Sequence, residues 1–215
     1  KTRVIAHQQQ MLRVDRETND AAEPRVTKRM LGAIEAELGT TNAVIICDYS
    51  KGAVTQELLD GLRALCKPRG IWLSFDPKPA HQLDLAGMSL ITPNRGELFA
   101  LAGLPDEATE ASLNAAVTAV QEKFEPAIML VTLSEHGMLL CPRDAKSTVI
   151  PTVAQEIYDV SGAGDTVIAS FPLAIAAGAS PAEAAVFSNH AAGVVVGKMG
   201  TAVVTPRELS GSFYV

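Results

Sequence analysis

Short apolar runs alternate with amphipathic segments along most of this chain. The stretch at residues 43–47 is continuously apolar, as in a strand buried on both faces of a parallel sheet, and residues 112–124 carry a clear apolar face with helical period. The predicted strands are residues 3–6, 11–15, 43–47, 71–75, 88–91, 128–131, 138–141 and 147–150, and the predicted helices are residues 24–38, 55–66, 95–103, 112–124, 163–178 and 182–197. This alternation predicts an α/β fold with a doubly wound, mostly parallel sheet and helices on both of its faces.

Polar and charged residues follow four of the predicted strands at the point where each strand ends. In an α/β sheet the ligand crevice lies outside the carboxyl ends of the strands, so these residues should meet on one rim. They are residues 48–52, 76–78, 92–97 and 132–137.

The loop at residues 158–166 leads directly into a further apolar helix. Gly162, Ala163 and Gly164 can present backbone N–H groups at the positive end of the helix dipole, and such a loop binds anions without a lysine or arginine. Asp165 is unfavourable beside an anion unless it has a task, so we interpret it as a base that takes a proton from a hydroxyl attacking a phosphate. An ordinary helix start with an acidic first turn explains the same spacing equally well.

Composition limits the classes of partner. The 215 residues are 47% hydrophobic, enough for one sizeable core, and we expect a single domain over residues 1–215 with edge strands in residues 1–20. A net charge of −6 disfavours nucleic acid or an anionic membrane as partner. Three scattered cysteines favour core thiols in a reducing, cytoplasmic compartment over a disulfide framework or a zinc site.

Each polar strand exit also has a purely structural interpretation. Asn94 and Glu97 have the spacing of a capping box, and Asn189 on an apolar helix suits a satisfied polar group in a core. Asp48 with Lys51 could be a turn with a solvated ion pair, and Lys78 could lie in a surface loop. Only their joint placement on one edge favours a binding site.

The motif Asp159-x-Ser161-Gly162-Ala163-Gly164-Asp165 resembles the C-terminal signature of the ribokinase-like (PfkB) carbohydrate kinases. Asn94-x-x-Glu97 resembles the second phosphate and magnesium motif of that family. Further segments resemble, within the family, the kinases of D-glycero-D-manno-heptose 7-phosphate, and the likeness runs from about residue 3 to residue 207. These segments include Asp48-Tyr49-x-Lys51-Gly52, Asp76-Pro77-Lys78, Val131-Thr132-Leu133-Ser134-Glu135 and Ala192 to Lys198.

The resemblance implies a kinase that uses ATP and Mg²⁺. Asp165 would deprotonate the anomeric hydroxyl, and the N–H groups of residues 162–164 would stabilise the transferring phosphoryl group. Asn94 and Glu97 would hold the ATP phosphates and a magnesium ion, which Glu97 would bind through water. The residues implied beside the nucleotide are Thr132, Ser134, Glu135 and Asn189. Those implied for the sugar phosphate are Lys51, Lys78, Asp48, Arg3 and Arg13, and those for a monovalent cation are Asp159 and Ser161.

The resemblance also implies parts that this sequence does not show. Relatives carry an N-terminal portion with the first strands and a Gly-Gly sugar-binding motif, so we expect a ribokinase-like sheet with its N-terminal part missing. Pro79 stands where glycine would be expected after Asp76-Pro77-Lys78. By analogy with relatives, residues 1–20 would form a lid, and a homodimer through this lid is implied. The same chemistry on fructose 6-phosphate or ribose, and a non-catalytic nucleotide or sugar sensor, remain as alternatives.

Overall fold

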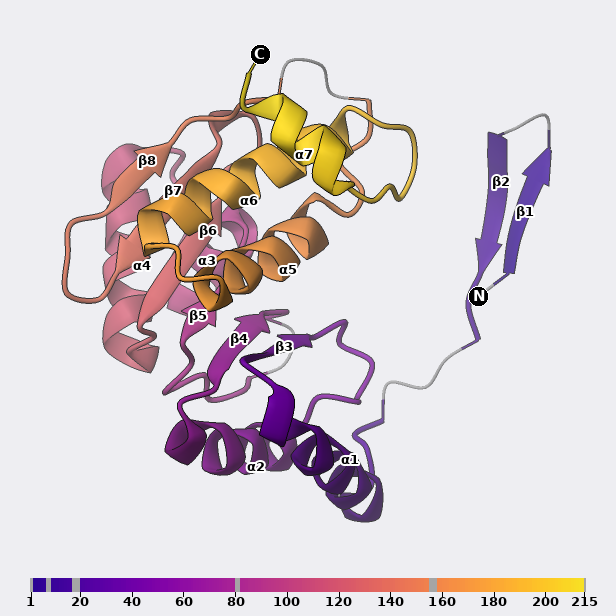
Figure 1. The fold of residues 1–215 in the computed structure, drawn as a ribbon, viewed down its shortest axis with the longest axis vertical. Coiled ribbons are helices and arrows are strands. Elements are labelled where there is room, and N and C mark those ends of the chain that lie inside the picture. The colour runs from indigo at the N-terminus through magenta and orange to yellow at the C-terminus, as the bar shows by residue number, and fades with distance from the viewer. Residues whose placement is uncertain (1, 7–8, 17–19, 80–81, 155–157, 215) are drawn as a thin grey trace.

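The computed structural model describes residues 2–6, 9–16, 20–79, 82–154 and 158–214. Within them, a six-stranded sheet holds its strands in the order β3-β4-β5-β6-β7-β8, which is also their order along the chain (Figure 1). The strands are β3 (Ala43–Cys47), β4 (Trp72–Asp76), β5 (Leu90–Ile91), β6 (Ile128–Thr132), β7 (Met138–Pro142) and β8 (Thr148–Ile150).

The first four strands of this sheet are parallel and the last two are antiparallel. β3 to β6 pair side by side in parallel, while β7 pairs with β6 and β8 with β7 in the opposite sense. The helices are α1 (Pro24–Glu37), α2 (Gln56–Cys66), α3 (Arg95–Ala102), α4 (Glu110–Phe124), α5 (Ala163–Ala176), α6 (Pro181–Val196) and α7 (Pro206–Ser212). The predicted α/β fold with a mostly parallel sheet is therefore confirmed.

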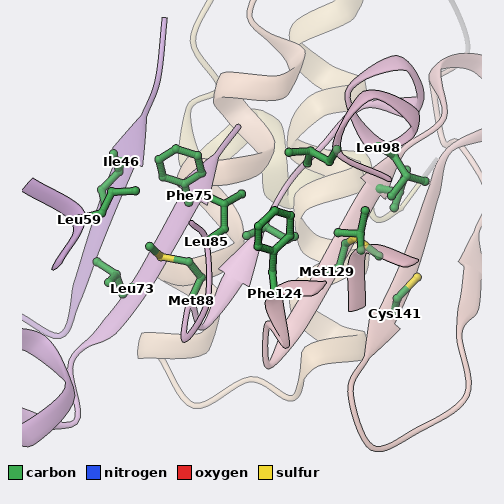
Figure 2. Packing of buried hydrophobic residues seen from close by; sticks show 14 of the residues in the cluster. Ile46, Leu59, Leu73, Phe75, Leu85, Met88, Leu98, Phe124, Met129 and Cys141 are labelled. Carbon is green, nitrogen blue, oxygen red and sulfur yellow. The ribbon is translucent and has the colours of Figure 1, made fainter. Parts of the chain in front are cut away.

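Two apolar clusters cover the two faces of the sheet. Side chains of α2, α3 and α4 pack on one face, around Leu59, Phe75, Leu98 and Met129 (Figure 2). On the other face, α5 and α6 pack against each other, with Phe171 and Leu130 in their cluster. The continuously apolar inner strands, such as β6, are buried on both faces. The helices thereby fix the carboxyl ends of β3 to β6 relative to the start of α5. Burial on both faces was also predicted for residues 43–47, and this prediction is wrong, because β3 is the edge strand of this sheet and its Ile45 is exposed.

The first residues form a separate antiparallel hairpin. Strands β1 (Thr2–Ala6) and β2 (Gln9–Val14) pair with Arg3 opposite Arg13, and the register shifts between Val4 and Ile5. Figure 1 shows the hairpin standing away from the six-stranded sheet. The strands predicted here are confirmed, whereas a role for the hairpin as a lid stays a prediction.

Two elements differ from the prediction. β5 is only two residues long. Just before it, the Ser89 N–H donates to the Leu73 carbonyl, and the Ser89 hydroxyl oxygen accepts from the Leu73 N–H. Helix α7 was not predicted, although Thr205 caps it and Pro206 begins it. Among the described residues, no helix combines the length and apolarity needed to cross a bilayer.

Candidate active site

A polar cavity opens where β3, β4, β5 and β6 end and α5 begins. Its volume is about 280 Å³. The residues that line it are Tyr49, Asp76, Lys78, Thr92, Asn94, Glu97, Thr132, Gly162, Gly164 and Asp165. The structure thus brings together the strand exits and the glycine loop that the sequence placed on one rim.

Asp165 stands in the first turn of α5, after Gly162, whose φ of 85° is in the left-handed region that favours glycine. The Tyr49 hydroxyl donates a hydrogen bond of 3.0 Å to Asp165 Oδ1. This bond, followed by partial burial, raises the pKa of Tyr49 to about 12, so the phenol stays protonated and remains a donor. The carboxylate predicted as a base is therefore held by a hydrogen bond from the loop that follows β3.

Of the loop N–H groups predicted to bind an anion, one is used within the loop. The Ala163 N–H donates to the Val160 carbonyl at 3.2 Å, and this bond shapes the turn into α5. Gly162 and Gly164 line the cavity, and the helix dipole of α5 still favours negative charge at this end.

Asn94 and Glu97 form the complete capping box of α3. Asn94 Oδ1 accepts from the Glu97 N–H at 2.9 Å, and Glu97 Oε2 accepts from the Asn94 N–H at 2.8 Å. The other Glu97 oxygen, Oε1, binds the ammonium group of Lys78. Asn94 also forms a parallel bridge to Thr132, which ties the start of α3 to the end of β6. The capping interpretation is confirmed, and the same two side chains line the cavity.

Asp76 is the buried acid of the cavity. Burial raises its pKa from 3.8 to about 6, while Lys78, 3.9 Å away, acts in the opposite direction. The Thr92 hydroxyl donates to Asp76 Oδ1 at 3.2 Å, and the charges of Glu97 and Asp165 add to the upward shift. A site with this excess of carboxylates over cations favours a further positive charge.

The donors of this cavity fit a magnesium ion. Mg²⁺ prefers carboxylate, water and phosphate oxygens, and Glu97 and Asp76 supply carboxylates on one side of the cavity. Among the described residues, no group of three or more histidine, cysteine, aspartate or glutamate side chains has the geometry of an all-protein metal site. The residues present therefore suit an ion that shares its ligands with water and a phosphate.

A second, more apolar cavity adjoins the first. It measures about 240 Å³ and shares Thr132 and Gly164 with the polar cavity. Ser134, Glu135 and Asn189 are polar members of its wall, and Val160, Val167, Ala192 and Val196 are apolar members. The Asn189 amide is buried and donates to the Pro151 carbonyl at 2.6 Å, so it also holds the chain after β8 in place. A mostly apolar cavity with a few polar groups suits a heterocyclic base.

Asp159 and Ser161 lie in the loop that precedes α5. Asp159 Oδ1 accepts from the Ser161 N–H at 2.8 Å and Oδ2 accepts from the Gly200 N–H at 3.2 Å. The hydrogen bonds from Ser161, and then that from Gly200, lower the pKa of Asp159. These contacts join the glycine loop to the chain after α6, and a monovalent cation at this place stays a prediction.

Asp48 and Lys51, both predicted for the sugar phosphate, are not among the residues that line the two described cavities. Asp48 is buried, and its Oδ1 accepts from the Ser50 N–H at 2.8 Å, while Lys51 is half-buried in the same loop. Arg3 and Arg13 face each other in the register of the hairpin, and their side chains lie outside what the structure describes. Of the predicted residues whose side chains the structure describes, Lys78 lines the polar cavity.

Tyr49, Asp76 and Thr92 lie within the rim segments predicted from the sequence, but no role was predicted for them. Asp76 ends β4, Thr92 directly follows β5, and Tyr49 lies two residues after β3, and these positions were the available signal. Their roles depend on contacts between elements far apart in the chain, which spacing along the sequence does not carry.

Residues 3–208 match the pfkB family carbohydrate kinase. The chain belongs to this family. A curated relative, the bifunctional protein HldE of Sulfurimonas denitrificans, is 41% identical over 209 residues, which cover 97% of this chain and 43% of the relative. The HldE of Geobacter metallireducens is 40% identical over 212 residues, which cover 99% of this chain and 43% of that protein. The chain thus spans less than half the length of these relatives.

Solved structures of carbohydrate kinases share the fold. A structure of Arabidopsis thaliana ribokinase complexed with ribose and ATP aligns with a TM-score of 0.71 at 20% identity, over 91% of this chain and 61% of that one. Phosphofructokinase-2 from Escherichia coli, in complex with potassium, gives 0.76 at 18% identity, over 90% of this chain and 63% of the other. The sheet described above is therefore ribokinase-like, as the sequence motifs predicted.

Proposed function

We propose that this PfkB protein transfers the γ-phosphoryl group of ATP to the anomeric hydroxyl of D-glycero-D-manno-heptose 7-phosphate. The observation that carries the phosphoryl transfer is the position of Asp165. It lies at the positive end of α5, in a polar cavity that shares Thr132 and Gly164 with an apolar one. The heptose is supported by relatives named HldE at about 40% identity over nearly the whole chain.

In this proposal the two cavities bind the two substrates. The base of ATP enters the apolar cavity beside Ser134, Glu135 and Asn189, and its phosphates cross Thr132 and Gly164. The start of α5 then faces the transferring group, where its dipole stabilises negative charge. Asp165 accepts the proton of the sugar hydroxyl, the sugar oxygen bonds to the γ-phosphorus, and the bond from phosphorus to the ADP oxygen breaks with its electron pair leaving on ADP.

Glu97, Asn94 and Asp76 are the residues that would hold magnesium, through water for Glu97. The bound ion would supply charge neutralisation between the phosphates. Lys78 is the cation of the polar cavity, where it contacts Glu97 and Asp76. Its ammonium group would stabilise the negative charge of the transferring phosphoryl group. Asp159 and Ser161 would bind a monovalent cation behind the glycine loop.

The sugar phosphate would be bound by residues that are not among those described as lining the polar cavity. Lys51 and Asp48 lie in the loop that carries Tyr49, and Arg3 and Arg13 come from the hairpin. The exposed apolar side chains of the hairpin, Val4, Met11 and Leu12, suit a homodimer contact. We place the protein in the cytoplasm, on the ADP-heptose route to the lipopolysaccharide core, and its three free thiols fit a reducing compartment.

ADP release in the presence of ATP and Mg²⁺ tests the proposal. The acceptors are heptose 7-phosphate, fructose 6-phosphate, ribose and no sugar, with Asp165→Asn as the inactive reference. Selective turnover of heptose 7-phosphate is expected. Turnover only with another sugar would retain the kinase and replace the substrate, and tight ATP binding with no turnover would favour the sensor.

A further inference from the structure

The contact between Tyr49 and Asp165 joins the end of β3 to the start of α5, 116 residues apart in sequence. The phenol ring is exposed along most of its surface, yet its hydroxyl is directed to one oxygen of the carboxylate. Both residues line the polar cavity. A tyrosine kept there for packing alone would bury its ring, and this one does not.

The loop that carries Tyr49 is held in one conformation from several sides. Ser50 has a φ of 55° in the left-handed region, and the buried Asp48 side chain accepts its N–H at 2.8 Å. Gly52 has a φ of 75°, and a Cβ placed on it would come within 1.9 Å of the Asp20 carbonyl oxygen. The Gly52 carbonyl also accepts from the Ala22 N–H at 2.8 Å. A non-glycine residue such as Ser50 adopts a left-handed conformation at a cost in free energy, so it persists only where the surrounding structure holds it. Such positions cluster at functional sites.

We propose that Tyr49 is a positioning residue for the phosphoryl transfer: its hydroxyl fixes Asp165 through Oδ1 and leaves Oδ2 for the hydroxyl of the acceptor sugar. The inference rests on the proposed function, because it assigns Tyr49 a task in the same reaction. Tyr49 itself gains and loses no proton. A fixed carboxylate matters because an acceptor oxygen attacks phosphorus productively only when its proton and its lone pair point in different, defined directions.

The hydroxyl of Tyr49 is suited to this task over the reaction cycle. Its hydrogen bond to Asp165 raises the pKa of Tyr49 to about 12, so the phenol keeps its proton at neutral pH. When Asp165 takes the proton of the acceptor on Oδ2, Oδ1 can still accept from Tyr49. The orientation of the carboxyl group is thereby kept through proton transfer.

A double-mutant cycle tests the inference, with Tyr49→Phe, Asp165→Asn and the double variant compared with the wild type. The acceptor is whichever sugar the wild type phosphorylates, so that an error in the sugar does not affect the test. Tyr49→Phe keeps the ring and removes only the donor, and we expect kcat to fall about ten- to a hundredfold, the size of a hydrogen bond to a charged group. The KM for ATP should stay within about twofold of the wild type, because the nucleotide lies in the other cavity. Tyr214→Phe, which removes the same hydroxyl from an exposed ring near the C-terminus, is the matched control and should leave kcat unchanged.

In the Asp165→Asn background, Tyr49→Phe should have almost no further effect on kcat, because the group that it positions no longer acts as a base. If the two substitutions lower kcat by independent factors, so that the double variant shows their product, the inference is overturned and the kinase function stays intact. A Tyr49→Phe protein with wild-type kcat would overturn it in the same way. Failure of the wild type to phosphorylate any acceptor would instead overturn the proposed function, and the role of Tyr49 would fall with it.

Discussion

Asn94 and Glu97 bind each other's backbone N–H at the start of α3, and Lys78 occupies the remaining Glu97 oxygen. The pair therefore stabilises a helix end and presents its polar atoms to the cavity at the same time. Capping and binding are not exclusive interpretations of this motif, because a capped helix N-terminus is itself a favourable place for phosphate. The two roles can be separated by comparison with caps elsewhere in the chain.

Asn94→Ala should lower the free energy of unfolding by about 1 kcal/mol, as expected for the loss of an N-cap. If Asn94 also binds the Mg·ATP phosphates, the KM for Mg·ATP rises as well. Ser180→Ala is the matched control, because Ser180 forms the same capping box on α6 with Glu183 and lines neither described cavity. Denaturant unfolding measures the stability of both variants, and initial-rate kinetics measure their KM for Mg·ATP. If this KM is the same in both variants, Asn94 acts only as a helix cap.

Asp165→Asn should lower kcat by about 10²- to 10⁴-fold, the usual contribution of a general base. The amide fills the same space and cannot take the proton. ATP affinity, measured by calorimetry, should change little because the apolar cavity is intact. Asp144→Asn in the exposed turn after β7 removes the same charge at a distance and should leave kcat unchanged. Near-normal turnover of Asp165→Asn would refute its role as the base.

Asp76 should make stability depend on pH between about 4 and 6. Its pKa is raised from 3.8 to about 6 in the folded protein, so the fold holds the proton more tightly than the unfolded chain does. The stability from this group is present in full below pH 4 and is lost as the pH rises through 6. Asp76→Asn removes the buried charge, so at pH 8 this variant should have a higher Tm than the wild type. Its free energy of unfolding should exceed that of the wild type by at most about 3 kcal/mol.

At pH 4 the same variant should have no such advantage, since Asp76 is then protonated. Thermal unfolding at the two pH values, with Asp144→Asn as a control for net charge, measures the difference. A Tm gain equal at both pH values would show that the shift does not come from burial of the Asp76 charge. We also expect Asp76→Asn to lower activity with Mg·ATP, because it removes a carboxylate from the cavity.

Gly52→Ala should be more damaging than Gly70→Ala. Both glycines have positive φ, 75° and 64°, so both substitutions impose a similar backbone cost of about 1 kcal/mol. Only at Gly52 would the new Cβ collide with backbone, at the Asp20 carbonyl, whereas nothing lies within 4 Å at Gly70. Because the Gly52 loop carries Tyr49, kcat should fall for Gly52→Ala and not for Gly70→Ala. Equal effects on unfolding and kcat would contradict a loop fixed by this close approach.

Apolar periodicity predicted most of the fold because strand and helix burial follow regular repeats. The strand at 43–47 and the helix at 112–124 match β3 and α4 closely for that reason. α7 was not predicted because it is short and has no buried side chains. Its cap was an available signal, since Thr205-Pro206-x-Glu208 has the same spacing as Ser180-Pro181-x-Glu183, which begins α6.

The rim of the site could be predicted from strand ends, but the pairings within it could not. Asp165 and Asn94 lie in local motifs whose spacing has a physical meaning by itself. The contacts of Tyr49 with Asp165, and of Lys78 with Glu97, arise only when elements far apart in the sequence pack together. Burial of Asp76, and with it the raised pKa, is likewise a property of the assembled packing.

The strand order has a consequence for how the chain reaches its folded state. Each strand from β4 to β8 pairs with the strand made immediately before it, so the sheet can lengthen while the polypeptide is still leaving the ribosome. The residues of the face covered by α2, α3 and α4, down to Cys141 in β7, have all been made before α5 and α6, which cover the other face. Synthesis therefore makes the Asp76 and Glu97 side of the polar cavity first, and Asp165 joins it only when α5 covers the second face of the sheet.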